Sequence, residues 1–411
     1  MNAPEAARNE AGSPHIMIVA GEPSGDALGA QLMTALRKLT GGAVEITGVG
    51  GELMREEGLT SLFDISDTSV MGLREVVPKI PVILRRVRET ADAAVRTRPD
   101  ALVLIDSPDF THRIARRLSR LAPEIKVIKY VAPQVWGSRP WRAAKLAEMV
   151  DHLLALLPFE PAFFEAYGLD THFVGHPVTE RVEKIGGGAA FRARHDIPPE
   201  AGLLCVLPGS RANEVRFLVP EFRETIRLVS KSVPDLVTVT PVVPHVRESL
   251  ETAFADWPVR AVAVGQDEKF QCFDAANAAL AASGTVTTEV ALARVPLVCA
   301  YRVGWLTSAI ARHFITTKFV TLINLIRHEG VVPEFVQEAC LAPEMAEELC
   351  LLLTDRKAAA RQVAEQDAAL AELGLGEEPP SLRAARAVLG VIGTPNSPAK
   401  LARRETVTEF P

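Results

Sequence analysis

Two acidic side chains follow an apolar run of this 411-residue chain at a position suited to catalysis. Asp106 and Asp109 come directly after residues 101–105, which we predict to be a buried strand. A carboxylate at the end of a buried parallel strand is partly desolvated, which raises its basicity and suits a general base. Either aspartate could be that base, and either could instead cap the helix that follows.

Two later turns could bind the phosphates of a nucleotide. Ser210 and Arg211 follow the apolar run 203–207, where backbone N–H groups and a guanidinium fork suit a diphosphate. The second turn follows the run 278–282 and consists of Ser283, Gly284 and Thr285. Small residues that open a helix form a phosphate-sized nest at its positive end. Capped turns with a solvated arginine are the alternative, but two anion sites at one sheet edge favour a nucleotide diphosphate.

Two further features could contact a sugar. Glu289 lies one helical turn beyond the second of these turns, where its carboxylate could accept both hydroxyls of a ribose or merely complement the helix dipole. Another turn follows the run 15–20 and contains Gly21, Glu22, Ser24, Gly25 and Asp26. Its glycines would let an anion or a polar sugar group approach a helix N-terminus, although a tight turn capped by Ser24 or Asp26 fits as well. The glycine order is not that of a dinucleotide fold, and no Gly-Lys pair supports a P-loop.

The elements that position these residues alternate between short apolar runs and helix-compatible stretches, which predicts an α/β fold with parallel sheets. We expect two doubly wound Rossmann-like domains facing across a cleft, with ligands at the carboxyl ends of the strands. The predicted parts are a disordered tail (1–14), a first Rossmann-like domain (15–177), a linker (178–195), a second Rossmann-like domain (196–343), C-terminal helices (344–391) and a second tail (392–411).

Composition excludes several classes of protein. Lys and Arg number 45 against 51 Asp and Glu, a net charge of −6, so we expect no nucleic-acid partner. The five cysteines form no C-x-x-C pair, which favours a reduced cytosol over a disulfide framework or a zinc site. His172 and His176 have H-x-x-x-H spacing but straddle a strand end, so we predict no metal there, and no cofactor. No apolar stretch has the length of a membrane span, and the N-terminus lacks the apolar region of a signal peptide.

Two amphipathic stretches bear on a lipid surface. An apolar stripe from Ile80 to Ala94 lies beside Lys79, Arg85, Arg86 and Arg88. A second apolar patch, from Trp305 to Phe314, lies beside Arg302, Arg312 and Lys318. Each could lie on a membrane surface or simply pack on the core. The pair favours an amphiphilic substrate taken from a bilayer.

Ordered motifs along the chain resemble those of the lipid-A-disaccharide synthase family, GT-B glycosyltransferases of Gram-negative bacteria. They are AGEPSGD (20–26), SVMGLREV (69–76), IDSPDF (105–110), YVAPQVW (130–136), LLPFEPAFF (156–164), FVGHPV (173–178), LPGSRANEV (207–215) and ASGTVTTE (282–289). The resemblance implies a metal-independent, inverting hexosyltransferase. Its donor would be UDP-2,3-diacylglucosamine and its acceptor the 6-hydroxyl of 2,3-diacylglucosamine 1-phosphate (lipid X), giving the β(1→6) tetraacyl disaccharide 1-phosphate and UDP.

The resemblance also implies that the domain 15–177 binds the lipid acceptor and that the domain 196–343 binds the UDP-sugar, and it implies roles for single residues. Asp106 matches the proposed general base and Arg211 an arginine beside the UDP diphosphate, while Glu289 matches a ribose contact and Asn324 an asparagine near the nucleotide. It further implies a cytoplasmic enzyme bound peripherally to the inner membrane, with a homodimer as one option. Two other classes stay open. One is another GT-B enzyme on a UDP-sugar, an N-acetylglucosaminyltransferase or an epimerase; the other is a non-catalytic lipid-binding protein.

Overall fold

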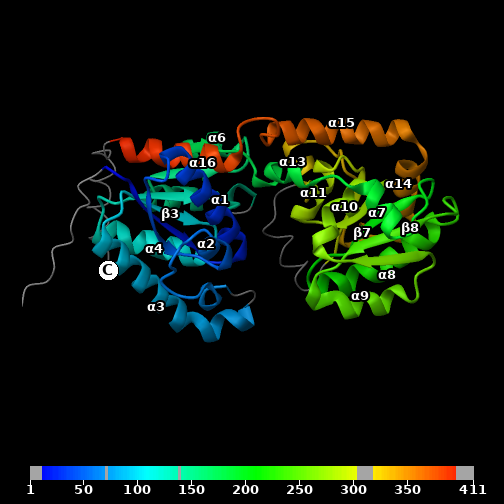
Figure 1. The fold of residues 1–411 in the computed structure, drawn as a ribbon, viewed down its shortest axis with the longest axis horizontal. Helices are drawn as coiled ribbons and strands as arrows, with labels where there is room; N and C mark the ends of the chain where they lie inside the picture. Colours follow the sequence, from blue (N-terminus) through cyan, green and yellow to red (C-terminus); the bar gives the residue numbers. More distant parts are fainter. Residues whose placement is uncertain (1–11, 70–72, 138–139, 303–317, 395–411) are drawn as a thin grey trace, which may run out of the picture. The chain divides into compact units, whose positions relative to one another are not determined.

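The computed structural model describes residues 12–69, 73–137, 140–302 and 318–394 (Figure 1). The chain divides into two compact units. Unit 1 comprises residues 1–177 and 377–411, and unit 2 comprises residues 178–376. The predicted tails at 1–14 and 392–411 lie almost wholly outside the described residues, as does the apolar patch from Trp305 to Phe314.

Unit 1 is built on a six-stranded parallel sheet in the order β2-β1-β3-β4-β5-β6. Its strands are β1 (His15–Ala20), β2 (Glu45–Val49), β3 (Ala101–Ile105), β4 (Lys126–Tyr130), β5 (His152–Ala155) and β6 (Asp170–Phe173). β3 is buried along its whole length because helices cover both faces of the sheet. The runs of apolar residues in the sequence therefore mark its strands.

Helices pack on both faces of this sheet, which therefore separates two hydrophobic cores. Alternate strand residues such as Val19 and Leu104 pack on α3, α4 and α5, whereas Ile18 and Val103 pack on α1, α2 and α16. The bounds are α1 (Pro23–Thr40), α2 (Glu52–Glu56), η1 (Ile65–Asp67), α3 (Leu73–Thr97), α4 (Pro108–Leu121), η2 (Val135–Gly137), α5 (Arg142–Met149), α6 (Glu160–Glu165) and α16 (Pro380–Gly393). The last helix of the chain thus completes the core of unit 1.

Unit 2 has a second six-stranded parallel sheet in the order β12-β11-β10-β7-β8-β9. Its strands are β7 (Leu203–Leu207), β8 (Val237–Pro241), β9 (Arg260–Val264), β10 (Ala278–Ala282), β11 (Leu297–Tyr301) and β12 (Glu334–Val336). β10, β7 and β8 are neighbours in the sheet, so the turns that follow these three strands meet at its carboxyl edge.

The helices of unit 2 also cover both faces of its sheet. α8 and α14 pack together on one face around Leu218, Phe222 and Met345, and α10 contacts β7 and β8. The bounds are η3 (Pro177–Lys184), α7 (Gly188–Arg194), α8 (Ala212–Val229), η4 (Pro244–Val246), α9 (Arg247–Phe254), η5 (Gln266–Glu268), α10 (Lys269–Ala275), α11 (Thr285–Leu292), α13 (Leu322–Arg327), η6 (Gln337–Ala339), α14 (Ala342–Thr354) and α15 (Arg356–Glu372).

The structure differs from the sequence-based expectation in two places. Residues 178–195, expected to be a linker, form η3 and α7, and Phe191 of α7 is fully buried in unit 2. In the glycine run 186–188, Gly187 is the N-cap of α7 and Gly188 its first residue. The expected C-terminal helices are α14, α15 and α16, of which the first two belong to unit 2 and the last to unit 1. Among the described residues, no helix is both long and apolar enough to cross a membrane.

Candidate active site

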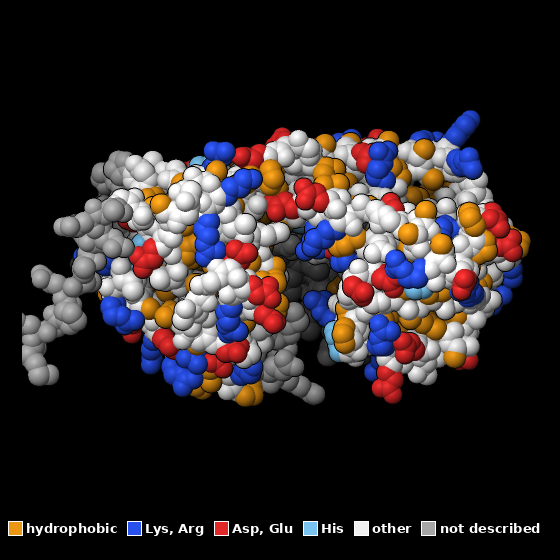
Figure 2. Space-filling view, viewed as in Figure 1, with side chains coloured by type: hydrophobic (Ala, Val, Ile, Leu, Met, Phe, Trp, Pro, Cys, Tyr) orange, Lys and Arg blue, Asp and Glu red, His pale blue; other side chains and the backbone are white. Residues whose placement is uncertain are grey.

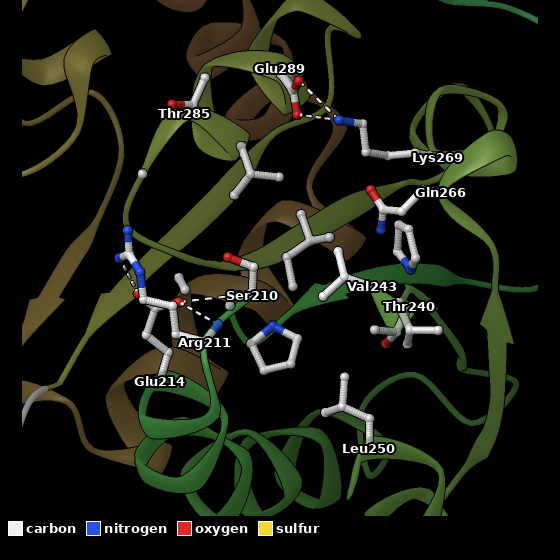
Figure 3. A pocket seen from close by; sticks show the side chains of 18 of the residues that line it. Ser210, Arg211, Glu214, Thr240, Val243, Leu250, Gln266, Lys269, Thr285 and Glu289 are labelled. Atoms are coloured by element: carbon white, nitrogen blue, oxygen red, sulfur yellow. Dashed lines mark hydrogen bonds and ion pairs between the residues drawn. The ribbon is translucent and has the colours of Figure 1, made fainter. Parts of the chain in front are cut away.

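A pocket of about 350 Å³ lies at the carboxyl edge of the unit 2 sheet (Figure 3). The ends of β7, β8 and β10 provide most of its lining. The lining residues are Leu207, Pro208, Gly209, Ser210, Arg211, Glu214, Thr240, Pro241, Val242, Val243, Leu250, Gln266, Lys269, Ala282, Ser283, Gly284, Thr285, Val286 and Glu289. The structure therefore brings both predicted phosphate-binding turns, and Glu289, to one cavity.

The turn after β7 is held open by Glu214. Oε2 of Glu214 accepts hydrogen bonds from the backbone N–H groups of Ser210 (3.1 Å) and Arg211 (3.3 Å), and Oε1 lies 2.8 Å from Nη1 of Arg211. Gly209 has φ 107°, in the left-handed region that favours glycine, and a Cβ there would meet the Glu214 side chain. The Arg211 side chain remains 65% exposed, so its guanidinium is available to an anion at the pocket.

The turn after β10 presents a helix N-terminus to the same cavity. Gly284 has φ 150° and is the residue before α11, whose first residues Thr285 and Val286 line the pocket. Oγ of Ser283 donates to the backbone oxygen of Val320 (3.0 Å) and its backbone N–H donates to that of Ala300 (3.0 Å), so this residue fixes the turn. Arg211 and this helix terminus are both groups that bind anions, and both line the cavity.

Glu289 is in the pocket lining but its carboxylate already has two cationic partners. It is 3% exposed, and Lys269 donates to both of its oxygens at 3.0 and 2.9 Å (Figure 3). Arg181 forms an ion pair with Oε1. Lys269 also lines the pocket, whereas Arg181 does not. Sequence reasoning missed Lys269, although it follows β9 at the same sheet edge and the rule applied to the other strand ends would have found it.

Asn324 is not in the pocket lining. It is 1% exposed, its Nδ2 donates to Val332 O (2.7 Å) and Glu334 Oε1 (2.8 Å), and its Oδ1 accepts from Val332 N. These bonds fasten α13 to the segment before β12. In this structure the Asn324 side chain has a structural role and does not line the cavity.

Asp106 follows β3 of unit 1 in an unusual backbone conformation. Asp106 and Ser107 have φ values of 44° and 39°, so two successive residues other than glycine occupy the left-handed region. The carbonyl oxygen of Asp106 accepts from Thr111 Oγ1 (2.7 Å) and from the ammonium of Lys129. The Asp106 side chain is half-buried. Asp109 is exposed in the first turn of α4.

Lys129 is a buried cation that sequence reasoning missed. It is 1% exposed on β4, and burial lowers its pKa to about 7, although the carboxylates of Asp106 and Glu22 act in the opposite direction. A lysine within a strand gives no local signal of this role, because only the pairing of β3 with β4 brings it behind the Asp106 turn.

The glycine-containing turn after β1 lies against the Asp106 turn. Ser107 Oγ donates to Glu22 Oε1 (3.0 Å), and a Cβ on Gly21 would lie 2.8 Å from Ser107 Oγ, so only glycine fits there. Thr68 Oγ1 donates to the carbonyl oxygen of Gly21 (2.9 Å). Ser24 is exposed and Gly25 is buried. Glu22 and Gly21 are thus the residues of this turn that the structure brings to Asp106.

Asp26 has a different task. Its 4%-exposed carboxylate accepts three backbone N–H groups at the start of α2, from Gly51 (2.7 Å), Leu53 (3.0 Å) and Met54 (3.1 Å). These bonds use the negative charge to stabilise a helix N-terminus, so Asp26 caps α2 instead of its own helix.

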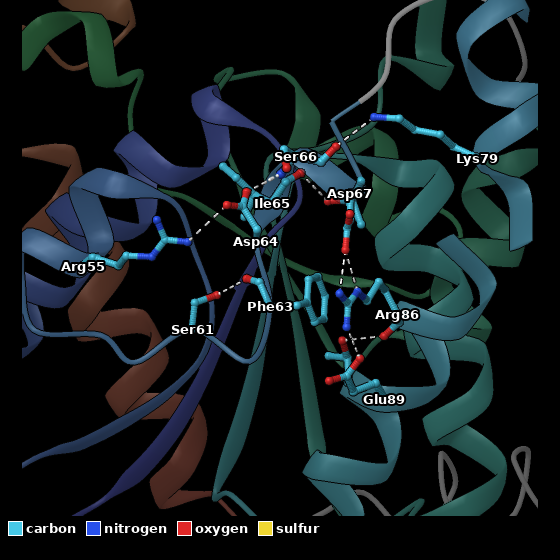
Figure 4. Close-up of polar contacts among 12 residues, drawn as sticks. Arg55, Ser61, Phe63, Asp64, Ile65, Ser66, Asp67, Lys79, Arg86 and Glu89 are labelled. Carbon is cyan, nitrogen blue, oxygen red and sulfur yellow. Dashed lines mark hydrogen bonds and ion pairs between the residues drawn. The ribbon is translucent and has the colours of Figure 1, made fainter. Parts of the chain in front are cut away.

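Arg86 anchors the segment that reaches this turn (Figure 4). Its guanidinium donates to Asp67 Oδ2 (2.8 and 2.6 Å) and to Glu89 Oε2 (2.6 Å), and it stacks over the Phe63 ring with 4.6 Å to the centroid. Because Thr68 follows Asp67, this ion pair ties α3 to the Gly21 turn through η1.

Comparison with known proteins identifies the family. The model of the lipid-A-disaccharide synthetase family matches residues 16–385. A lipid-A-disaccharide synthase of Rhodospirillum centenum is 47% identical over 92% of this chain and 94% of that protein. The same enzyme of Paramagnetospirillum magneticum is 48% identical over 92% of this chain and 97% of its own. The chain belongs to the lipid-A-disaccharide synthase family. It is a glycosyltransferase of lipid A biosynthesis, as its ordered motifs predicted.

Solved structures confirm the GT-B fold. The calicheamicin glycosyltransferase CalG4 matches with a TM-score of 0.59 at 16% identity, covering 93% of this chain and 99% of that one. Acinetobacter baumannii MurG matches with a TM-score of 0.56 at 14% identity, covering 92% and 99%. A Neisseria meningitidis UDP-GlcNAc 2-epimerase bound to UDP-GlcNAc gives 0.58 at 11% identity, covering 92% and 99%. At such low identity these likenesses establish the fold alone.

Proposed function

We propose that this lipid-A-disaccharide synthase family member transfers 2,3-diacylglucosamine from UDP-2,3-diacylglucosamine to the 6-hydroxyl of lipid X, with inversion and without a metal. The observation that carries the proposal is the unit 2 pocket, where Arg211 and the N-terminus of α11 line one cavity at the carboxyl edge of the sheet. Such a cavity suits a diphosphate leaving group. The UDP-GlcNAc held by the Neisseria meningitidis epimerase of the same fold supports a UDP-sugar here.

The proposed donor site assigns each lining group a task. The diphosphate lies against Arg211, Ser210 and the N–H groups of Gly284 and Thr285, while Val243 and Leu250 offer apolar contact to the nucleoside. Glu289 accepts the ribose hydroxyls, which requires it to share its carboxylate with Lys269. Preorganised cations and N–H groups stabilise the charge that develops on the departing UDP.

In the proposed step, the 6-oxygen of lipid X attacks the anomeric carbon of the donor. A C–O bond forms as the bond from that carbon to the UDP oxygen breaks, UDP leaves as an anion, and the hydroxyl proton passes to the carboxylate of Asp106. One displacement inverts the anomeric centre. Asp106 is favoured over the exposed Asp109 because its turn is fixed by Lys129 and Thr111, which orients the base.

Membrane contact is the remaining part of the proposal. A second pocket, of about 310 Å³, lies between α3 and α4 and is lined by Leu84, Val87, Arg88, Arg113, Arg116, Arg117, Arg120 and Leu121. Leu84 and Leu121 are 36% and 49% exposed, and Figure 2 shows Lys and Arg side chains with hydrophobic atoms beside α3. Arginines around exposed leucines suit an anionic lipid surface, which supports peripheral binding to the inner membrane.

The test is turnover in EDTA with both proposed substrates in detergent, following UDP and disaccharide together. We expect equal amounts of both from the wild type, about 10²- to 10⁴-fold slower turnover for Asp106→Asn, and about 10²-fold slower turnover for Arg211→Ala. Arg216→Ala is the matched control, since Arg216 is exposed on the same helix but does not line the pocket.

Each other outcome changes the proposal in a defined way. UDP without disaccharide means donor hydrolysis or another acceptor. Loss of turnover in Asp109→Asn but not in Asp106→Asn transfers the role of base to Asp109. Interconversion of UDP-GlcNAc without an acceptor would favour an epimerase. Full activity in both Asp106→Asn and Arg211→Ala would reject the assigned mechanism.

A further inference from the structure

Two histidines and an aspartate cluster at the edge of the unit 1 sheet, away from the proposed chemistry. His152 opens β5, and Asp170 opens the edge strand β6, which also carries His172. We refer to His152, Asp170 and His172 as the edge-strand triad. The strand register places His152 level with Val103 of β3 and His172 level with Ile105, and β4 lies between β3 and β5, so the triad is separated from the Asp106 turn across the width of the sheet.

The strand register places all three side chains on one face. His152 pairs with Asp170, and Leu154 pairs with His172, so alternation along each strand directs the triad to the face that bears Leu154. One ligand atom from each residue lies within 4.8 Å of the other two. Nδ1 of His152 lies 3.1 Å from Oδ2 of Asp170, and Nε2 of His172 lies 3.7 Å from Oδ1.

The separations between these atoms are close to those that a metal ion requires. Ligands at about 2.0 to 2.2 Å from a tetrahedral ion lie roughly 3.3 to 3.6 Å apart, so movements of the order of an ångström close the set. The two imidazole rings stack with centroids 5.8 Å apart and an interplanar angle of 25°. Nε2 of His172 is shielded from solvent and makes no hydrogen bond within the described residues. This nitrogen faces the Asp170 carboxylate across 3.7 Å and is available as a ligand.

We propose that the edge-strand triad binds one Zn²⁺ ion. Two imidazole nitrogens and one carboxylate oxygen form a borderline ligand set that suits zinc better than magnesium or calcium. The side chains of Asp170 and His172 are 54% and 43% exposed, which leaves room for water to complete the coordination. The bound ion cross-links the edge strand β6 to β5, so its role is to stabilise unit 1.

Zn²⁺ binding to the untagged full-length protein, first stripped with a chelator and then dialysed, tests the proposal. We expect one equivalent of Zn²⁺ to bind at micromolar concentrations in competition with a chromophoric chelator, and Co²⁺ to give visible absorption bands of a site with nitrogen ligands. His172→Ala and Asp170→Asn should each weaken binding at least about tenfold. Both residues are half-exposed, so circular dichroism should show that these variants fold.

The matched control is His195→Ala, because His195 pairs with the carboxylate of Glu268 and belongs to no three-residue ligand cluster within the described part of the chain. This variant should bind Zn²⁺ as the wild type does. Saturating Zn²⁺ should raise the Tm of the wild type and of His195→Ala but not that of His172→Ala. Absence of stoichiometric binding, or equal binding by His172→Ala and the wild type, would overturn the proposal. Transferase turnover in EDTA is a separate readout and does not depend on this site.

Discussion

The buried ammonium of Lys129 offers a quantitative test of how the Asp106 turn is held. Burial lowers its pKa from 10.5 to about 7, and in the folded protein it donates to the carbonyl oxygen of Asp106 and to Thr111 Oγ1 (3.2 Å). We predict that Lys129→Met removes one component of the pH dependence of stability, since methionine fills a similar volume without a charge.

The sign and size of that component follow from the two pKa values. Between pH 7 and 10.5 the unfolded chain holds a proton on Lys129 that the folded chain has released, so the free energy of unfolding rises with pH. Each pH unit is worth about 1.4 kcal/mol. From pH 7.5 to 9.0 the wild type should therefore gain about 2 kcal/mol relative to Lys129→Met. Below pH 7 the group is protonated in both states, and the two stability curves should run parallel.

Urea unfolding at pH 6.0, 7.5 and 9.0 measures this difference, followed by tryptophan fluorescence of a Trp257→Phe, Trp305→Phe background, in which Trp136 and Trp141 of unit 1 are the fluorophores. Lys145→Met is the control, because Lys145 is exposed on α5 and its loss should not change the slope between pH 7.5 and 9.0. If Lys129→Met and the wild type gain equally over this interval, then Lys129 is not a neutralised buried cation and the reasoning fails. We also expect kcat to fall in Lys129→Met, since the Asp106 carbonyl loses a donor.

Two further predictions concern buried carboxylates of unit 1. Asp26→Ala leaves three backbone N–H groups at the start of α2 without their acceptor, which should lower the free energy of unfolding by about 3 to 6 kcal/mol in urea titrations; unchanged stability would mean that this cap is dispensable. Burial raises the pKa of Glu160 to about 7, so the folded state keeps a proton that the unfolded state loses above pH 4.5. Between pH 5 and 7 the wild type should lose about 2 kcal/mol relative to Glu160→Gln, and parallel urea midpoints across that range would contradict it.

Most strands of both sheets could be predicted because each is a short apolar run with a helix-compatible stretch after it. The runs at 15–20, 101–105, 203–207 and 278–282 match β1, β3, β7 and β10 residue for residue. The short strand β12 was not predicted, because three residues carry too little periodicity to stand out. The linker prediction at 178–195 differs from the structure because three glycines interrupt the alternation of apolar runs there, although the chain continues with the helices η3 and α7.

Positions at strand ends could also be predicted, since the carboxyl edge of a parallel sheet gathers the turns that follow its strands. Arg211, Ser283 and Glu289 meet in one pocket for this reason. Whether a given polar group is free for a ligand could not be predicted in the same way. Asp26 and Asn324 satisfy backbone groups instead, and this depends on which segments pack beside them.

The sequence by itself determined the α/β class, the strands and the family, because apolar periodicity and ordered motifs are local properties of the chain. Only the tertiary structure decided which charges share a partner. Glu289 meets Lys269, 20 residues away, and Arg181, 108 residues away, and the triad of His152, Asp170 and His172 forms only when β5 pairs with β6. Such contacts depend on strand order and packing, which no local pattern specifies.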